Sequence, residues 1–416
     1  MEIQDIYNQQ KDNLLFSDSE IFNSYRNELI NSFNIKSKEI KNNESLKYFD
    51  RSIIDNFKYK YSDLSSKHIF QKNSKINKKQ INILNGKLNI VENFNDETLK
   101  IKIINNKNLF FENQIEKNNN FFKEDYIVKL NSIMMNAGYE LNIKNNKNEK
   151  IYITNTVNLD GITVFQKNFL TIGKNSRLVI IETYLNDIPS NINAINFFDI
   201  QDNAEVTHLI FQKNKLAANL QLTSHASCGV NSKYKQVTFN LSDGSSRNHH
   251  YVNLNGKKSS ADLLGVFFGS KKQIIDNKTQ VNHNQTDSNS NQKYKGILTD
   301  QSRASYLSKT FVDKIAQKTE AYQLSKGIIL SDNSYFHSKP ELKIYADDVK
   351  CSHGSTIGPL DSDLLFYLRT RGLSKKKAVS LLIQSFFHDI TSLIQEKDFL
   401  SLVNKHSNEW LKENDI

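Results

Sequence analysis

The residue types best suited to bind a metal stand close together near the end of the chain. Cys351 and His353 close an alternating pattern that predicts a β-strand, and side chains two apart on a strand share one face. A thiolate and an imidazole on one face could supply half of the ligands of an iron, zinc or iron–sulfur site. The remaining ligands would have to come from elsewhere in the chain or from a partner. The alternative is a buried structural Cys with a hydrogen-bonded His.

Other common catalytic motifs are absent from the sequence. There is no G-x-x-x-x-G-K-[ST] loop, so we expect no ATP site in this chain, and no G-x-S-x-G, H-E-x-x-H or paired C-x-x-C motif occurs. Asp347 and Asp348 are an acidic pair that a polysaccharide-active β-helix enzyme could use. Adjacent residues on a strand point to opposite faces, however, so these two cannot flank one glycosidic bond. That enzyme class remains an alternative, and we expect a protein that is not an enzyme.

The length and composition narrow the class of protein. A chain of 416 residues suggests two or three structural units, and its two cysteines fit a reducing compartment rather than a disulfide framework. The formal charge of +10 does not predict nucleic-acid binding, because the lysines are scattered and no basic stripe alternates with aromatic residues. No apolar run has the length of a membrane span. We therefore expect a cytoplasmic protein without membrane contact, and an organellar copy that has lost a transit peptide stays open.

The middle of the chain carries an internal repeat. Short strands rich in β-branched and aromatic residues follow one another from residue 86 to 357, separated by polar turns. Asn175, Asn203 and Asn231 each introduce a strand, and 203 − 175 and 231 − 203 both give a spacing of 28 residues. A repeat of that length, made of strands and turns only, predicts stacked coils. We interpret residues 86–357 as a parallel β-helix rather than a sandwich or barrel.

Helical patterns flank this region on both sides. Residues 1–85 are interpreted as an N-terminal helical domain, with Ile21, Tyr25 and Leu29 on one stripe and Ser17 or Asp18 as a cap. Residues 358–416 are interpreted as a C-terminal helical domain with three helices. Its apolar stripe is expected to pack partly on the β-helix and partly on a partner. The candidate partner-binding residues are Leu364, Leu365, Leu368, Arg369, Arg371, Leu381, Leu382 and Phe386.

Several phrases in the last third of the chain resemble a known family. KPELKIYADDVKCSHG (339–354) and LFYLRTRGLS (365–374) resemble the C-terminal signature of the SufB/SufD family, and of its SufD branch in particular. IDNKTQVNH (275–283), QKYKGIL (292–298) and AQKTEAYQ (316–323) extend the resemblance upstream. It implies a right-handed parallel β-helix flanked by helical domains, in a subunit of the SufBCD iron–sulfur cluster assembly complex.

The resemblance also implies partners and a role. The chain would be a non-catalytic scaffold that pairs with SufB through the ends of the β-helix and binds the ATPase SufC through its C-terminal helices. His353 would then be a ligand of a nascent iron–sulfur cluster at the interface with SufB. Cys351 could be a second ligand, a transient sulfur carrier or part of the core. A SufB-type scaffold subunit is the alternative within the same family.

Overall fold

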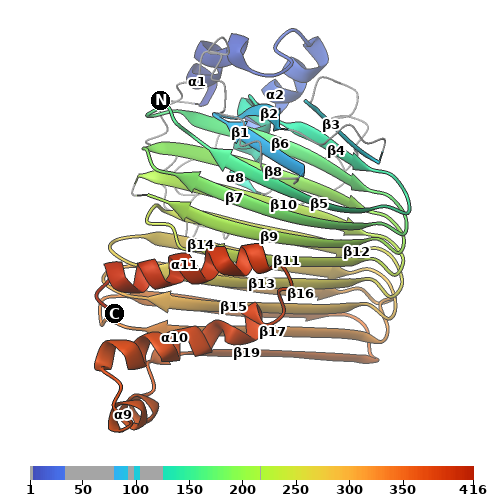
Figure 1. Ribbon diagram of the computed structural model, residues 1–416. Helices are drawn as coiled ribbons and strands as arrows, with labels where there is room; N and C mark the ends of the chain where they lie inside the picture. Colours follow the sequence, from blue (N-terminus) through green and yellow to red (C-terminus); the bar gives the residue numbers. More distant parts are fainter. Residues whose placement is uncertain (1–2, 33–78, 92–97, 104–124, 216) are drawn as a thin grey trace.

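The protein is built around a stack of parallel strands (Figure 1). The structure, a computed structural model, describes residues 3–32, 79–91, 98–103, 125–215 and 217–416. Strands make up 50% and helices 23%, and the strands form a parallel β-solenoid of about eight turns with helices at both termini. This confirms the predicted fold class, a mainly β protein with a parallel β-helix between helical segments.

Each turn of the solenoid gives one strand to each of two sheets. In spatial order the ten-stranded sheet contains β19 (Val349–Pro359), β17 (Thr319–Ile329), β15 (Asn289–Leu298), β13 (Ser260–Gly269), β11 (Lys233–Asn240), β9 (Glu205–Asn214), β7 (Arg177–Asn186), β5 (Asn148–Thr156), β1 (Lys79–Leu84) and β2 (Lys87–Val91). The nine-stranded sheet contains β18 (Tyr335–Ile344), β16 (Arg303–Val312), β14 (Ile274–His283), β12 (Ser246–Leu254), β10 (Ala218–Cys228), β8 (Ser190–Ile200), β6 (Thr163–Ile172), β4 (Tyr139–Ile143) and β3 (Leu99–Ile103). The named strands pair in parallel, apart from the antiparallel pairs β1–β2 and β3–β4.

A ladder of asparagines at one corner explains the repeat of 28 residues. Asn146, Asn175, Asn203 and Asn231 have φ angles of 59°, 57°, 57° and 54°, a left-handed conformation that asparagine tolerates better than most residues. The side-chain amide of each of the last three donates a 3.0 Å hydrogen bond to the asparagine one turn before. The repeated Asn therefore marks a corner of the solenoid, where the chain turns into the next strand.

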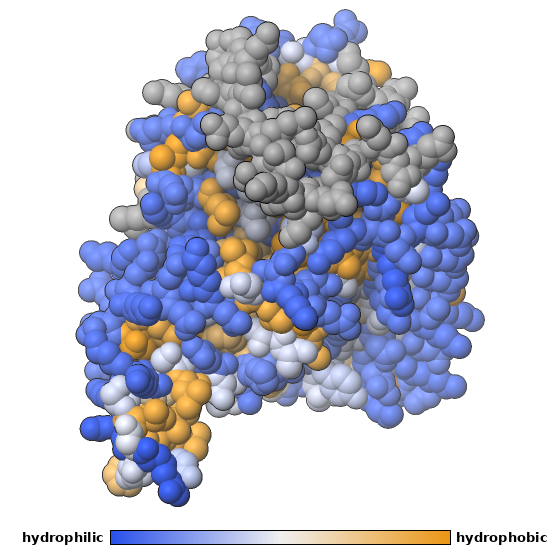
Figure 2. All heavy atoms as spheres, in the orientation of Figure 1, coloured by the Kyte–Doolittle hydropathy of each residue, from blue (hydrophilic) through white to orange (hydrophobic). Residues whose placement is uncertain are grey.

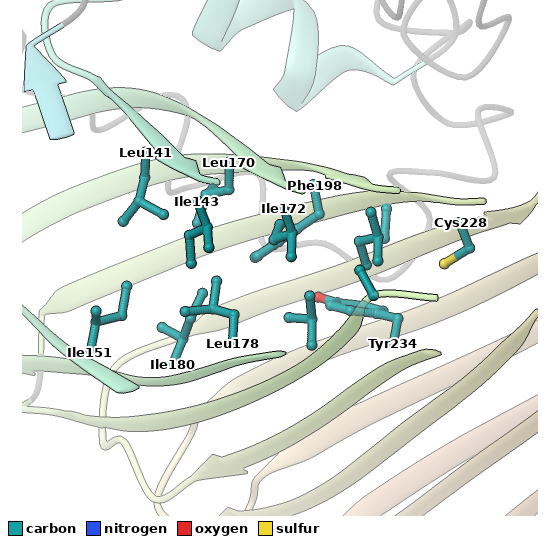
Figure 3. Packing of buried hydrophobic residues seen from close by; sticks show 14 of the residues in the cluster. Leu141, Ile143, Ile151, Leu170, Ile172, Leu178, Ile180, Phe198, Cys228 and Tyr234 are labelled. Atoms are coloured by element: carbon teal, nitrogen blue, oxygen red, sulfur yellow. The ribbon is translucent and has the colours of Figure 1, made fainter. Parts of the chain in front are cut away.

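The core lies between the two sheets and is apolar in the early turns. Figure 3 shows Leu141, Leu170 and Phe198 from one sheet facing Ile151 and Ile180 from the other. Alternate residues of each strand point inward, so each turn buries its apolar side chains against those of the next turn. Burying one such side chain contributes about 1.5–3 kcal/mol, and the stack repeats this gain at every turn.

Helices lie at the N-terminal end of the solenoid. They are α1 (Ile3–Gln10), the 3₁₀ helix η1 (Lys11–Asn13), α2 (Glu20–Ser32) and α8 (Tyr126–Met134), and α8 packs against the nine-stranded sheet. The predicted stripe on α2 was wrong at Ile21, which is 70% exposed, whereas Tyr25 and Leu29 are partly buried and pack against the core. The most buried residues of the helix are Phe22, Arg26 and Ile30. The guanidinium of Arg26 belongs to this buried face, where it donates to the Leu15 carbonyl at 2.7 Å and lies over the Phe22 ring. Residues 33–78 of the predicted helical domain lie outside the described residues.

A hairpin crosses the position where the helical and β regions were expected to meet. β1 and β2 pair antiparallel around Asn85 and Gly86, whose φ angles are 51° and 82°. An Asn-Gly pair with two positive φ angles is the turn that best fits a two-residue hairpin. The strands therefore begin at Lys79, before residue 86. In the part of the chain that the structure describes, we find no helix that is both long and apolar enough to span a membrane.

Candidate functional site

Both sheets end at the same open end of the solenoid. β18 and β19 are terminal strands, each with a neighbour on one side only among the described strands. No residue of β19 is buried, whereas eight of the ten residues of β13 are buried. An edge strand presents backbone N–H and C=O groups that can pair with another chain. The open end is therefore a surface on which a further strand could continue either sheet.

Cys351 lies at this open end, on the inward side of β19. It stands in register with Ala321 of β17 and packs beside Val312 and Ala316, in a small apolar cluster. Burial raises the pKa of the Cys351 thiol, and a hydrogen bond with the Ala321 backbone opposes part of that rise. The thiol must therefore lose a proton before it can bind a metal, and metal binding to it would release that proton.

His353 is the next inward-facing residue of β19. Its register partner on β17 is Gln323, and residues in register on parallel strands point to the same side of a sheet. His353 is exposed because no further turn covers it. Within the ranges that the structure describes, no group of three or more His, Cys, Asp or Glu side chains could hold a metal ion. The role of Cys351 and His353 as metal ligands thus stays a prediction.

The end of the interior next to these two residues is polar. We call it the mouth, and it consists of Ser338, Cys351, His353 and Ser355 around the side chains of Gln323 and Ser325. The hydroxyls of Ser325 and Ser338 are buried, and neither has a hydrogen-bond partner among the described residues. Buried polar groups are normally hydrogen-bonded, so each of these two hydroxyls can still take a partner, such as a water or a group from another chain.

Two of the three C-terminal helices cover the outer face of the ten-stranded sheet (Figure 1). The three are α9 (Ser362–Thr370), α10 (Lys375–Thr391) and α11 (Lys397–Glu413), of which α10 and α11 pack on the sheet, and Ser374 caps α10 as predicted. α10 buries Ile383, Phe387 and Ile390, at the spacing of one helical face. They pack, with residues of α11, against a row of apolar side chains of the sheet that includes Phe211, Leu209, Val237, Phe239, Val266 and Phe268.

Ion pairs fix these helices on the sheet. The Lys295 ammonium on β15 lies 2.8 Å from the Asp389 carboxylate of α10 and over the Phe386 ring. Further along, the Lys213 ammonium lies 2.9 Å from the Glu409 carboxylate of α11. Hydrogen bonds from Lys213 and from His406 lower the pKa of Glu409 to about 2. α10 and α11 are therefore integral to the solenoid.

α9, by contrast, extends beyond the sheet and buries none of its residues. Leu364, Phe366 and Tyr367 are 51%, 70% and 53% exposed. Figure 2 shows apolar residues gathered at the lower left, where α9 lies. Of the other candidate partner-binding residues, Leu381, Arg369 and Arg371 are exposed, whereas Leu365, Leu368, Leu382 and Phe386 are partly buried. An exposed apolar helix of this kind is typical of a protein-binding surface.

Polar side chains also fill part of the solenoid interior, which the sequence analysis missed. Glu182 is 1% exposed and accepts hydrogen bonds from Asn155, Asn196 and Tyr184, and it lies 2.8 Å from His208. Alternation alone assigns polar residues of a strand to the outside. Only the register, which brings these groups together, shows that they point inward and satisfy one another.

A second buried cluster lies on the outer face of the nine-stranded sheet. Asp125 caps α8 and pairs with Arg247, while His249 lies 3.0 Å from Asp276. Burial would raise the pKa of Asp125, but Arg247 and His249 outweigh it and hold this pKa well below its usual range. His250 points the other way, into the interior, where burial lowers its pKa. We interpret this cluster as the anchor of α8 on the sheet.

Residues 152–386 match the family model described as SUF system FeS cluster assembly, SufBD core domain. The chain belongs to the SufBD family. The matched range includes Cys351, His353 and the open end of the solenoid, and it confirms the SufB/SufD resemblance of the C-terminal phrases.

Individual relatives agree with this membership. An iron–sulfur cluster assembly SufBD family protein of Synechocystis is 32% identical over 213 residues, which cover 51% of this chain and 46% of the relative. The iron–sulfur cluster assembly protein SufD of Escherichia coli is 28% identical over 242 residues, or 56% of each chain. SufD of Plasmodium falciparum is 27% identical over 236 residues, which cover 55% of this chain and 16% of the relative. The chain thus spans about half the length of the first two relatives.

Proposed function

We propose that this SufBD-family chain is a non-catalytic scaffold subunit of a SufBCD-type iron–sulfur cluster assembly complex. The open end of the solenoid is the observation that carries this proposal, because the terminal strands of both sheets and the closely spaced Cys351 and His353 occur there together. The names of the relatives, two of them called SufD, support the same role. Two free cysteines fit a reducing compartment, and we assign the complex to the cytoplasm.

The open end is the surface proposed to pair with SufB. A strand of SufB added to β18 or β19 would satisfy the exposed backbone groups of that edge and would cover the mouth. The nascent cluster, which is the cargo of the complex, would then lie between the two subunits. Cys351 and His353 supply a soft thiolate and a borderline imidazole, both good ligands for iron, and SufB would provide the rest.

The exposed face of α9 is the surface proposed to bind SufC. α10 and α11 are occupied by the sheet, so the free apolar residues are those of α9 and the exposed side of α10, including Leu364 and Leu381. Arg369 and Arg371 flank this surface and can pair with acidic groups of a partner. ATP would bind to SufC, not to this chain.

The cluster-ligand role is tested by His353→Ala in the reconstituted complex. His353 is exposed, so its replacement should leave the fold intact and the complex should still assemble. Cluster yield, followed by visible absorption and by iron and sulfide content, should fall at least about tenfold. Ser352→Ala, on the outward side of the same strand, is the matched control and should keep wild-type yield. A normal yield in His353→Ala would show that His353 is not a ligand.

The SufC surface is tested by replacing Leu364 and Leu381 with alanine. Buried apolar anchors at an interface contribute about 1–3 kcal/mol each, so the Kd for SufC should rise about 10-fold or more by calorimetry. Lys405→Ala, an exposed position on α11, is the control. Removing all residues after Pro359 is a poorer test, since it would uncover the apolar face of the sheet. Unchanged affinity of the double variant for SufC would show that SufC binds to a different surface of this chain.

A further inference from the structure

Gln323 lies next to His353 at the open end of the solenoid. The two residues are in register on β17 and β19, and the Gln323 side chain is 3% exposed. Neighbouring strands lie about 4.8 Å apart, so a hydrogen bond can join side chains that face the same side. Building on the proposed function, we infer that Gln323 is a positioning residue that selects the tautomer and orientation of the His353 imidazole for metal binding.

The hydrogen bonds of the Gln323 amide leave one acceptor position available. Its Nε2 group donates to the Thr310 hydroxyl at 2.8 Å and to the Glu341 carbonyl at 3.1 Å, which uses both of its hydrogens. Its Oε1 atom accepts from the Ser308 hydroxyl at 3.1 Å. An amide oxygen has two lone pairs, so a second donor can still bind to Oε1.

The orientation of this amide is determined by its partners. A backbone carbonyl can only accept a hydrogen bond, so the nitrogen of Gln323 must face Glu341, and the oxygen takes the opposite position. Thr310 is held in turn by Gln292 from the turn below, at 2.8 Å. The remaining group that Gln323 can offer to the mouth is therefore an acceptor.

An acceptor beside an imidazole selects one of its two tautomers. If one ring nitrogen of His353 donates its hydrogen to Oε1 of Gln323, the lone pair of the other nitrogen is free for the metal. Metal-bound histidines commonly donate their second ring N–H to a carbonyl or carboxylate, which fixes the ring and raises its basicity. Gln323 supplies such a carbonyl at the end of a buried hydrogen-bond network, which fixes the position of its side chain.

Gln292 provides a matched control one turn deeper. It stands in register with Gln323, donates to the same Thr310 hydroxyl and to the Lys309 carbonyl, and accepts from Thr279. Its environment therefore repeats that of Gln323, but it does not adjoin His353. A purely structural role predicts equal effects at the two glutamines, whereas a positioning role predicts an effect on His353 from Gln323 alone.

The first measurement is the tautomer of His353 in the full-length chain. We would record ¹⁵N spectra of histidine-labelled protein at a pH where imidazole is neutral, and assign His353 from the signals lost in His353→Asn. One tautomer should dominate in the wild type, in Gln292→Met and in Gln323→Glu, which keeps an acceptor oxygen. Gln323→Met should give a mixture. Equal spectra for the two methionine variants would overturn the inference.

The second measurement is cluster yield in the complex with SufB and SufC. Gln323→Met should lower the yield about 10-fold, whereas Gln292→Met should keep the wild-type yield. Both variants should lower the melting temperature by similar amounts. If His353→Ala lowers the yield but the two methionine variants do not differ, only the positioning role is wrong. If His353→Ala keeps the full yield, the proposed ligand role is wrong as well, and so the two failures can be told apart.

Discussion

His208 and His353 occupy the same inward column of the ten-stranded sheet, yet their surroundings are opposite. The column runs in register through Ile180, His208, Gln236, Leu263, Gln292, Gln323 and His353. His208 is fully buried and lies 2.8 Å from Glu182, whereas His353 is exposed at the mouth. The inner turns and the last turn thus share one backbone plan and differ in whether a neighbouring turn covers them.

The difference shows how one end of a solenoid can expose side chains that the inner turns bury. In the inner turns polar side chains such as Glu182, Gln292 and His283 bond to neighbouring residues of the stack, so those residues stabilise it. In the last turn the same positions have neighbours on one side only, so their side chains stay available to a partner. If this is correct, substitutions at inner positions should affect stability, and matching substitutions in the last turn should affect assembly of the cluster.

The largest contrast should come from the two histidines. His208→Leu leaves the buried Glu182 carboxylate without a hydrogen-bond partner that lies 2.8 Å away. Removing a partner from a buried charged group lowers the free energy of unfolding by about 3 kcal/mol or more. His353→Ala should change it by less than about 0.5 kcal/mol, because surface positions rarely matter more. Urea unfolding of the two variants checks this. Equal losses would mean that the last turn is as tightly packed as the inner ones.

Acid should weaken the inner turns through His283. This residue is bonded to Ser288 and Ser290, and burial lowers its pKa from 6.5 to about 4. Between pH 6.5 and pH 4 the unfolded chain binds a proton at His283, whereas the folded chain does not. The free energy of unfolding therefore has its full value above pH 6.5 and falls as the pH drops from 6.5 to 4. The loss is about 3 kcal/mol for this residue.

Unfolding measured across this pH range tests the assignment. His283→Gln removes the titrating group, so the variant should show a shallower fall of the unfolding free energy between pH 6.5 and 4. An unchanged slope in the variant would show that other groups cause the acid sensitivity.

Two glycines allow the packing of an inner turn to be compared with that of the last turn. A Cβ atom at Gly265 would lie 2.3 Å from the ring of Tyr294, which is buried and stacked on Tyr306. Gly265→Ala should therefore destabilise by about 1–3 kcal/mol, as overpacked cores do. No atom lies within 4 Å of a Cβ at Gly358 in the last turn, so Gly358→Ala should be nearly neutral. The melting temperatures of both variants test this expectation. A large drop of the melting temperature in Gly358→Ala would show that the last turn is packed as tightly as the inner turns.

The two cysteines give the smallest contrast. Cys228 is fully buried in the core, and burial raises its pKa to about 12. Because its surroundings are apolar, Cys228→Ser would bury a hydroxyl there at a cost of about 1–3 kcal/mol. Cys351→Ser, at the half-buried mouth, should cost less than about 1 kcal/mol and lower cluster yield. Wild-type stability and yield in Cys351→Ser would exclude both a ligand role and a core role for Cys351.

The sequence predicted the features that depend on local pattern. The spacing of Asn175, Asn203 and Asn231 indicated stacked coils because each turn needs a corner residue that tolerates a left-handed conformation. The strand that carries Cys351 and His353 followed from alternation, and Ser374 followed from the hydrogen bond that starts a helix. The hairpin at Asn85 and Gly86 also had a local signal, which our reading of residues 1–85 as helical overlooked.

The tertiary structure decided which residues meet. The local sequence does not show that Gln323 faces inward. Its place beside His353 follows from the register of the strands, which also aligns it with Gln292, more than 30 residues earlier in the chain. The burial of Ile383 and Phe387, rather than Leu382 and Phe386, depends on how α10 lies across the sheet, with Asp389 held by Lys295. Local chemistry determines the strands and corners of this chain, but contacts between distant turns determine what each side chain can do.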